Sequence, residues 1–150
     1  GRVWMRFVGW GDWIFKWTRE FLDFNRYPTA FPLSDEITLP GLPADALAVR
    51  MEDRHLQGVD PMWVARASLT NAELQEFRTL GGSKVMRKFL QSKMAVKDAV
   101  RLWRSRSMRM GLTHPAEYQI EHDAQGKPYV AGIQDRFVPT ISVTHKDNVV

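Results

Sequence analysis

The feature that most constrains the fold is one long helical pattern that runs from about Ser83 to Met108. Placing each residue 100° after the last brings five bulky side chains into one narrow arc of this helix. These are Val85, Phe89, Val96, Val100 and Trp103. Such a stripe predicts a helix that lays one face on a core.

A second line on the same helix is basic. Lys93, Lys97, Arg101 and Arg104 recur at i, i+4, i+8 and i+11, centred roughly 90° round from the apolar stripe. This position suits a groove beside the helix, and it equally suits a solvated basic face. Between Lys84 and Arg109 there are nine basic residues and one acidic residue, Asp98, whereas the rest of the chain has more acidic than basic residues. The nine basic residues are Lys84, Arg87, Lys88, Lys93, Lys97, Arg101, Arg104, Arg106 and Arg109.

The chain before this helix predicts mainly strands and a connector. Residues 3–17 are aromatic and β-branched, so we expect one or two strands there, bent near Gly9-Gly11. Four prolines between residues 28 and 44 exclude a regular helix. Short strands are predicted for residues 46–51 and 62–69.

A capping box then marks a helix start. Thr70 and Glu73 have the spacing in which a threonine hydroxyl and a glutamate each bind the other's backbone amide. We expect a short helix over 71–77, ended by Gly81-Gly82.

After the long helix the pattern changes to a period of two. Residues 117–122 predict a strand, 123–126 a turn, and 128–131 a returning strand. Another strand is expected over 140–145, followed by a tight turn at 146–148 into Val149-Val150.

Composition narrows the classes of function. One hundred and fifty residues that are 44% hydrophobic suffice for one core, and no cysteine is present for a disulfide or a thiolate metal site. The four histidines lack metal-ligand spacing, and we expect no metal site in this chain. We find no apolar run near eighteen residues and no leader, so we expect a cytoplasmic protein without a membrane partner. Gly1 at the start and Val149-Val150 at the end suggest a piece of something longer.

A basic helix suggests nucleic-acid binding as one possible function. However, the aromatic residues lie mainly in the expected N-terminal strands and not among the basic residues. No phosphate loop and no nucleophile elbow occur. We expect no nucleic-acid partner. Binding of another polyanion is a weaker interpretation than the two that are given below.

Four motifs nevertheless follow one another in a specific order. They are Leu69-Thr70-x-x-Glu73-Leu74, Arg87-Lys88-Phe89-Leu90-Gln91-Ser92-Lys93, Asp123-Ala124-Gln125-Gly126-Lys127-Pro128-Tyr129 and Ile141-Ser142-Val143-Thr144-His145. Over residues 69–150 this order resembles the N-terminal half of the surfactin-type 4′-phosphopantetheinyl transferases. The stretch 95–101 is most like the transferase-like domains embedded in polyketide and polyunsaturated fatty-acid synthases. Residues 1–20 look like the segment after a dehydratase region in such synthases, so 1–68 are assigned to a strand and connector region and 69–150 to the transferase-like lobe.

The resemblance implies one lobe of a two-lobed α+β fold, with a long helix on a small antiparallel sheet and coenzyme A in the cleft between lobes. It implies that an acyl carrier protein serine attacks the β-phosphate of coenzyme A, which transfers the phosphopantetheine arm and releases 3′,5′-ADP. Phosphoryl transfer of this kind depends on positioning and charge stabilisation.

The resemblance also implies which residues bind coenzyme A. Lys88 and Lys93 stand where the family has phosphate-binding arginines, and Ser92 replaces a glycine beside them. The turn residues Gly126, Lys127 and Pro128 match the turn that packs against the nucleotide. Thr144 and His145 match the pair that contacts the phosphates, and Lys146-Asp147 replaces the small pair that usually follows.

The family's metal-binding acids and its lysine-glutamate helix have no counterpart within these residues. We therefore expect no catalytic residue here, no Mg²⁺ except in a complete two-lobed enzyme, and no activity of this chain alone. The alternative is a non-catalytic transferase-like module that serves as a structural or interaction element of a polyketide synthase. Expected partners are an acyl carrier protein, a second lobe or neighbouring synthase domains, and a second copy of the chain, because an isolated lobe exposes an apolar face.

Overall fold

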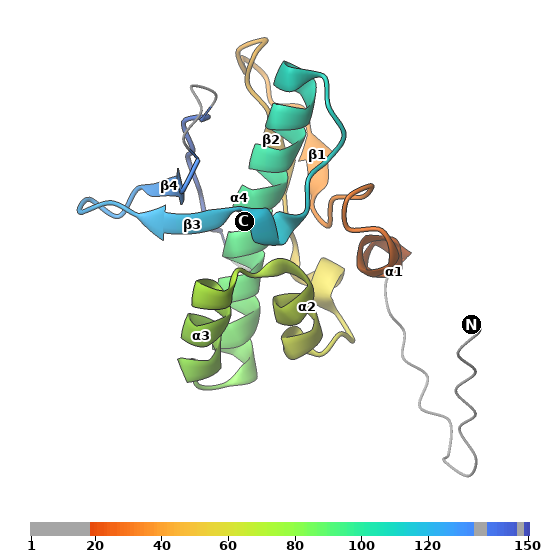
Figure 1. Cartoon of the computed structure of the whole chain (residues 1–150), viewed down its shortest axis with the longest axis vertical. Helices are drawn as coiled ribbons and strands as arrows, with labels where there is room; N and C mark the ends of the chain where they lie inside the picture. Colours follow the sequence, from red (N-terminus) through yellow and green to blue (C-terminus); the bar gives the residue numbers. More distant parts are fainter. Residues whose placement is uncertain (1–18, 134–137, 147–148) are drawn as a thin grey trace.

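A computed structural model describes residues 19–133, 138–146 and 149–150, and it is organised around the long helix α4 (Ser83–Met108) (Figure 1). The predicted bounds of this helix are confirmed. It begins after Gly82, whose φ is 84°, and ends at Arg109, which adopts a left-handed conformation with φ 52°. The amides of Arg109 and Met110 then bond to the Arg106 and Ser105 carbonyls, which closes the last turn.

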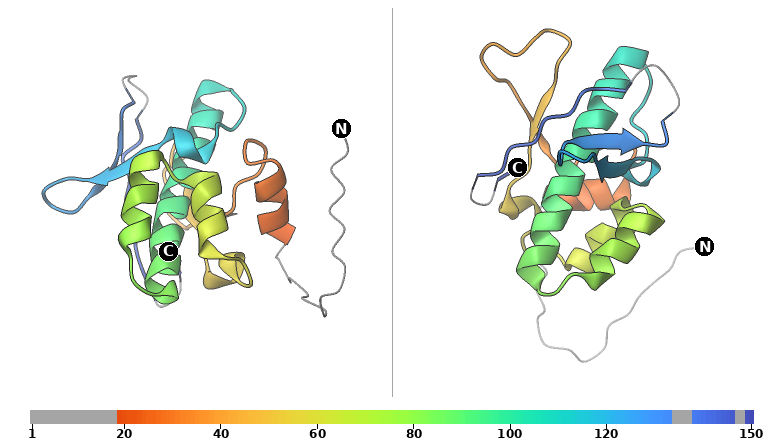
Figure 2. Two further views of the ribbon diagram at one scale, coloured as in Figure 1. Left: turned by 60° about the horizontal axis from the view of Figure 1, so that its bottom comes forward. Right: turned by 90° about the vertical axis from the view of Figure 1, so that its left-hand side faces the viewer.

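The N-terminal part of the described chain lies against one side of α4 (Figure 2). It consists of α1 (Arg19–Arg26), an antiparallel pair of β1 (Asp35–Ile37) and β2 (Ala48–Arg50), and the 3₁₀ turn η1 (Asp53–Leu56). The strand expected over 46–51 is thus confirmed as β2, and the proline-rich connector holds a short strand and no helix. The strands expected in residues 3–17 lie outside the described residues.

The strand expected over 62–69 is wrong, because this stretch forms the helix α2 (Pro61–Ser68). The Asp60 side chain accepts a hydrogen bond from the Met62 amide at 2.8 Å, and Pro61 occupies the first helical position. Val64, Ala65 and Ser68 are buried, which is a helical spacing. A short apolar run fits a strand or a buried helix equally well by its pattern alone, and here the cap decides.

The capping box at Thr70 is confirmed at the start of α3 (Asn71–Thr79). The Glu73 amide donates to the Thr70 hydroxyl at 3.3 Å, and the Thr70 amide donates to the Glu73 carboxylate at 3.0 Å. Together with α2, this helix covers the first half of α4 (Figure 2).

A hairpin crosses the middle of α4. After the 3₁₀ turn η2 (Pro115–Glu117), β3 (Gln119–His122) pairs antiparallel with β4 (Pro128–Ala131), so the expected strand begins two residues later than predicted. The predicted turn forms because Asp123 accepts hydrogen bonds from the Gln125 and Lys127 amides. Gly126 has φ 80°, a conformation that side chains disfavour.

The strand expected over 140–145 is not formed in the described residues. Ile141 is buried and Val143 packs beside it, so the predicted alternation holds, but no neighbouring strand completes a ladder. Farther on, Lys146 and Glu52 form isolated bridges with Val149, and Val150 exchanges two backbone hydrogen bonds with Met51.

The helices and the two small antiparallel sheets form an α+β fold, as predicted. Two apolar clusters lie on either side of α4. The first joins Leu90 and Met94 of α4 to side chains that include Phe21 and Phe24 of α1 and Phe77 of α3. The second joins Val96 and Val100 to the hairpin and the segment after it, through Tyr118, Ile120, Val130 and Ile141. Burying each such side chain contributes about 1.5–3 kcal/mol.

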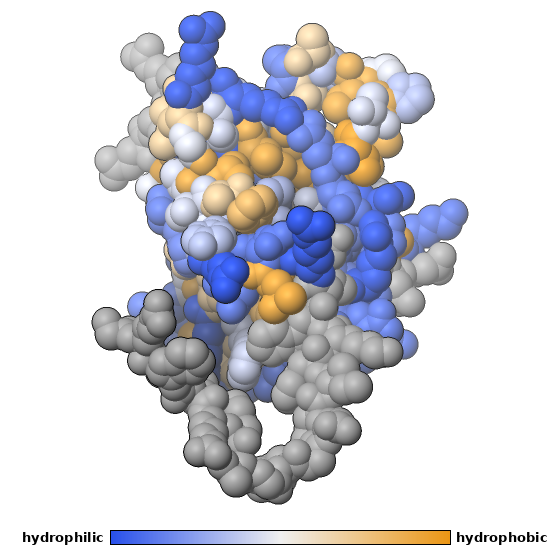
Figure 3. All heavy atoms as spheres, turned by 90° about the vertical axis from the view of Figure 1, so that its right-hand side faces the viewer, coloured by the Kyte–Doolittle hydropathy of each residue, from blue (hydrophilic) through white to orange (hydrophobic). Residues whose placement is uncertain are grey.

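The face that carries α1 keeps apolar side chains among polar ones (Figure 3). In and just after α1, Leu22, Tyr27 and Phe31 are 45%, 54% and 42% exposed. Across the described ranges, no helix combines the length and the apolar character that crossing a membrane requires.

Candidate functional site

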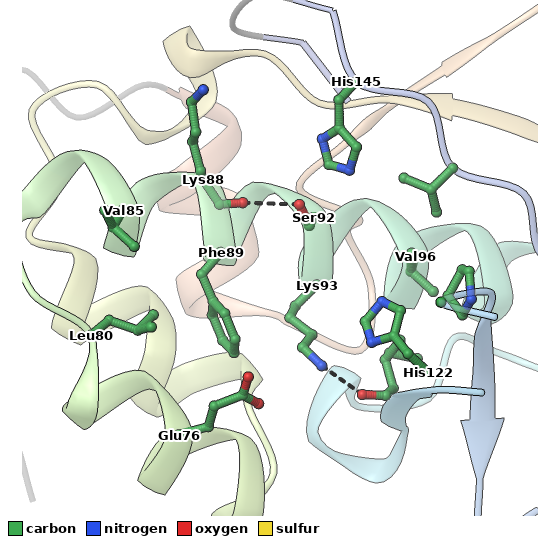
Figure 4. Close-up of a pocket in the computed structure, with 14 residues that line it drawn as sticks. Glu76, Leu80, Val85, Lys88, Phe89, Ser92, Lys93, Val96, His122 and His145 are labelled. Atoms are coloured by element: carbon green, nitrogen blue, oxygen red, sulfur yellow. Dashed lines mark hydrogen bonds between the residues drawn. The ribbon is translucent and has the colours of Figure 1, made fainter. Parts of the chain in front are cut away.

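A pocket of about 560 Å³ lies over α4, between α3, the hairpin and the segment 138–146 (Figure 4). Five of the seven residues that the resemblance implies line this pocket. They are Lys88, Lys93, Gly126, Pro128 and His145. Three separate stretches of the chain thus meet at one place.

Lys88 and His145 form one side of the pocket. Lys88 is exposed on the second turn of α4, and its side chain extends away from Phe89 (Figure 4). His145 reaches toward the same helix from the segment 138–146, and both residues also line a smaller adjoining pocket with Val149 and Val150. Both side chains can therefore reach a ligand bound there.

Ser92, which stands where the family has glycine, lines the floor of the pocket. Its hydroxyl donates to the Lys88 carbonyl at 3.0 Å, a bond back to the preceding turn of its own helix. The hydroxyl is thereby directed along the helix.

The hairpin turn forms the opposite side. The register pairs His122 with Pro128, which holds Gly126 beside the pocket. A Cβ added to Gly126 would meet nothing within 4 Å, so its positive φ rather than crowding favours glycine there.

Lys93 lines the pocket, but its ammonium group already has partners. The side chain is 7% exposed, donates to the Ile120 carbonyl at 2.6 Å, and lies 3.9 Å from the Glu73 carboxylate. The ammonium is also 5.4 Å from the centre of the Phe89 ring. Lys93 therefore ties α4 to the hairpin, and its charge is largely balanced within the protein.

Burial extends along the rest of the basic line, so the predicted solvated face or open groove is wrong for its central residues. Lys97 and Arg101 are 0% and 1% exposed. Lys97 donates to Glu73 and to the Ser68 carbonyl, and burial lowers the pKa of Lys97 although the Glu73 charge opposes this. Arg104 is half-buried.

Arg101 binds partners from three parts of the chain. It donates to Asp98 at 2.7 Å, to the Thr113 carbonyl at 2.7 Å, and to the Pro28 carbonyl. Burial lowers the pKa of Arg101, and the Asp98 charge acts in the opposite direction. Lys93, Lys97 and Arg101 therefore connect α4 to other parts of the fold.

Two residues of the implied set do not line the pocket. Lys127 is exposed in the turn, where its amide donates to Asp123 at 2.8 Å. Thr144 is exposed between two pocket residues, Val143 and His145, and successive side chains of an extended segment point to opposite sides.

Sequence reasoning missed His122 and Glu76, which also line the pocket. The signal for His122 was the alternation of β3, since Ile120 is buried and His122 lies two residues farther on the same face. Glu76 lies one turn after Glu73 on α3, and no motif marked it.

The pocket combines two lysines and two histidines with one glutamate, a balance that suits an anionic ligand. In the described ranges, no three histidine, aspartate or glutamate side chains gather where a metal ion could be held. The residues of these ranges therefore do not fit a magnesium site.

No protein-family model, no curated protein and no solved structure matches the chain.

Proposed function

We propose that this chain carries the coenzyme A phosphate- and nucleotide-binding lobe of a 4′-phosphopantetheinyl transferase that loads an acyl carrier protein in polyketide or fatty-acid biosynthesis. One observation supports this above all. Five residues chosen by their place in the motifs come from three distant stretches and line one pocket.

The chemistry of the pocket is consistent with a phosphate chain. Lys88 and His145 supply donors on one side, and both are exposed to a ligand. On the other side, the turn has glycine at position 126, where the positive φ favours it. Because glycine has no side chain, a ligand can come close to the backbone there. These residues bind and orient coenzyme A while the carrier serine attacks the β-phosphate and 3′,5′-ADP leaves.

The proposed role of this chain is binding rather than chemistry. Positioning and charge stabilisation carry most of the catalysis of phosphoryl transfer, but a general base and a metal ion are still needed. Incubating the chain with coenzyme A, Mg²⁺ and an acyl carrier protein should load no phosphopantetheine, and a mass increase of the carrier would contradict this.

The second candidate is the non-catalytic transferase-like module of a synthase. The internal partners of Lys93 favour it, because a lysine bound to Ile120 and near Glu73 offers a ligand little net charge. In that case the pocket would be a remnant and the lobe would serve as a structural element.

Titration with 3′,5′-ADP in a calorimeter distinguishes the two. We expect binding by the unmodified chain, and a loss of about three- to tenfold in affinity for Lys88→Ala and for His145→Ala, since each removes one charge-assisted contact. Lys84→Ala is the matched control, because Lys84 is exposed one turn earlier on the same helix and does not line the pocket.

Absence of binding would refute the coenzyme A proposal and favour the structural module. An equal loss in Lys84→Ala would instead indicate non-specific attraction to a polyanion, which should weaken steeply with added salt.

A further inference from the structure

His122 occupies an unusual place in the hairpin. It lies on the same face of β3 as Ile120, which is 3% exposed in the second apolar cluster, yet His122 itself is exposed. Its pairing with Pro128 fixes the backbone at the point where the ladder ends and the turn begins. An inward-facing side chain just beyond the core is therefore presented to the pocket.

The two imidazoles approach the pocket from opposite sides. In Figure 4, His145 extends from the segment 138–146 on the Lys88 side, whereas His122 rises from β3 on the Lys93 side. Ser92, Lys93 and Val96 of α4 lie between them. A ligand lying across α4 at this point would have an imidazole at either side.

Among the pocket residues that the structure describes, the hairpin side has two basic groups, Lys93 and His122. Lys93 already binds the Ile120 carbonyl and approaches Glu73, so His122 is the group that remains available to a ligand there. The other charged groups that share the surface around His122 are Glu73, Glu76 and Glu121, and Lys88 stands with His145 on the far side.

We propose that His122 is a second imidazole ligand of the bound phosphate chain, opposite His145, and that the affinity of the pocket for a pyrophosphate diester rises as the pH falls from 8 to 6. This rests on the proposed function. A neutral imidazole donates one N–H, whereas a protonated one donates two and carries a positive charge. Histidine is the side chain whose charge ordinarily changes between pH 5 and 8.

The test uses dephospho-coenzyme A as the probe. Its pyrophosphate is a diester without a phosphomonoester group, so its charge stays constant over this pH range and any change in affinity comes from the protein. We expect the unmodified chain to bind the probe at pH 8 and to bind it more tightly at pH 6. Each imidazole that contacts the phosphates should increase the affinity about two- to fivefold between these pH values.

Two substitutions at one exposed position separate charge from shape. His122→Asn should remove the His122 part of the tightening at pH 6, whereas His122→Lys should bind at pH 8 more tightly than the unmodified chain does at pH 8, by about the His122 part of the tightening. The double variant His122→Asn, His145→Asn should show no tightening. Circular dichroism of each variant checks that the fold is retained.

The outcomes separate this inference from the function on which it rests. Binding at both pH values with the same pH response in His122→Asn would overturn the role of His122 and leave the coenzyme A proposal standing. No binding of dephospho-coenzyme A or of 3′,5′-ADP by the unmodified chain at either pH would overturn both.

Discussion

At the scale of single residues, the structure depends on charged side chains that are nearly inaccessible to water. Asp98 is 0% exposed and accepts hydrogen bonds from the Leu33 and Ser34 amides, each at 2.8 Å, and from Arg101. Burial of an isolated charge is strongly unfavourable, so these hydrogen bonds offset the free-energy cost of burying the Asp98 carboxylate. The two backbone amides lie more than sixty residues away in sequence, and no pattern within α4 identifies them.

We expect His114 to make the stability of the fold depend on pH. His114 accepts a hydrogen bond from the Ala116 amide at 3.1 Å as the cap of η2. Burial lowers the pKa of His114, the Arg101 charge lowers it further, and Glu117 opposes both. In the unfolded chain the imidazole takes up a proton near pH 6.5, whereas in the folded chain it stays neutral to a lower pH. The stabilisation is therefore complete above about pH 6.5 and is lost as the pH falls through the folded pKa.

We expect the urea midpoint to fall between pH 7.5 and 5.5 and to fall less in His114→Asn, which keeps a capping acceptor. His122→Asn serves as the control, and its urea midpoint should fall between pH 7.5 and 5.5 by as much as that of the unmodified protein. An unchanged slope in His114→Asn would show that other groups cause the loss.

At the scale of elements, one carboxylate joins three of them. Glu73 is 3% exposed, caps α3 through the Thr70 amide, accepts from the Ile120 amide of β3 at 3.0 Å, and pairs with Lys97 of α4. A capping box predicts the first of these contacts only. The other two make Glu73 the point at which α3, β3 and α4 are held together.

A double-mutant cycle measures this connection. Lys97→Met should lower the free energy of unfolding by about 3–5 kcal/mol, because it leaves the Glu73 charge buried without its main partner. The variant that combines Glu73→Gln with Lys97→Met should cost less than the sum of the single changes, with a coupling of about 1–3 kcal/mol in urea denaturation. Strictly additive costs would mean that the pair does not interact.

At the scale of the whole molecule, α4 separates two apolar clusters and binds the N-terminal segment through polar contacts. Asp98 holds the backbone at Leu33 and Ser34, while Arg101 reaches the carbonyls of Pro28 and Thr113. The clusters supply most of the burial, and these contacts determine where the connector lies against the helix.

Removing Asp98 tests this arrangement. Asp98→Ala should lower the free energy of unfolding by about 3–5 kcal/mol, since Arg101 and two backbone amides lose their acceptor. Asp53→Ala, at an exposed acid of η1, should change it by less than about 0.5 kcal/mol. Equal effects of the two substitutions in urea denaturation would show that the buried pair does not stabilise the fold.

The sequence by itself determined the elements whose hydrogen bonds close within a few residues. The long helix from Ser83 to Met108, the Thr70 capping box and the turn at Asp123 follow from local spacing, and all three are present. The order of the motifs also selected five of the residues that line the pocket.

The tertiary structure decided what local spacing leaves open. Whether residues 140–145 find a neighbouring strand depends on partners distant in sequence. The same holds for Lys97 and Lys93, which look like a surface line until Glu73, Ser68 and Ile120 are placed beside them. A charge next to an apolar stripe is equally compatible with water and with a buried acceptor, and only the packing of other elements provides the acceptor.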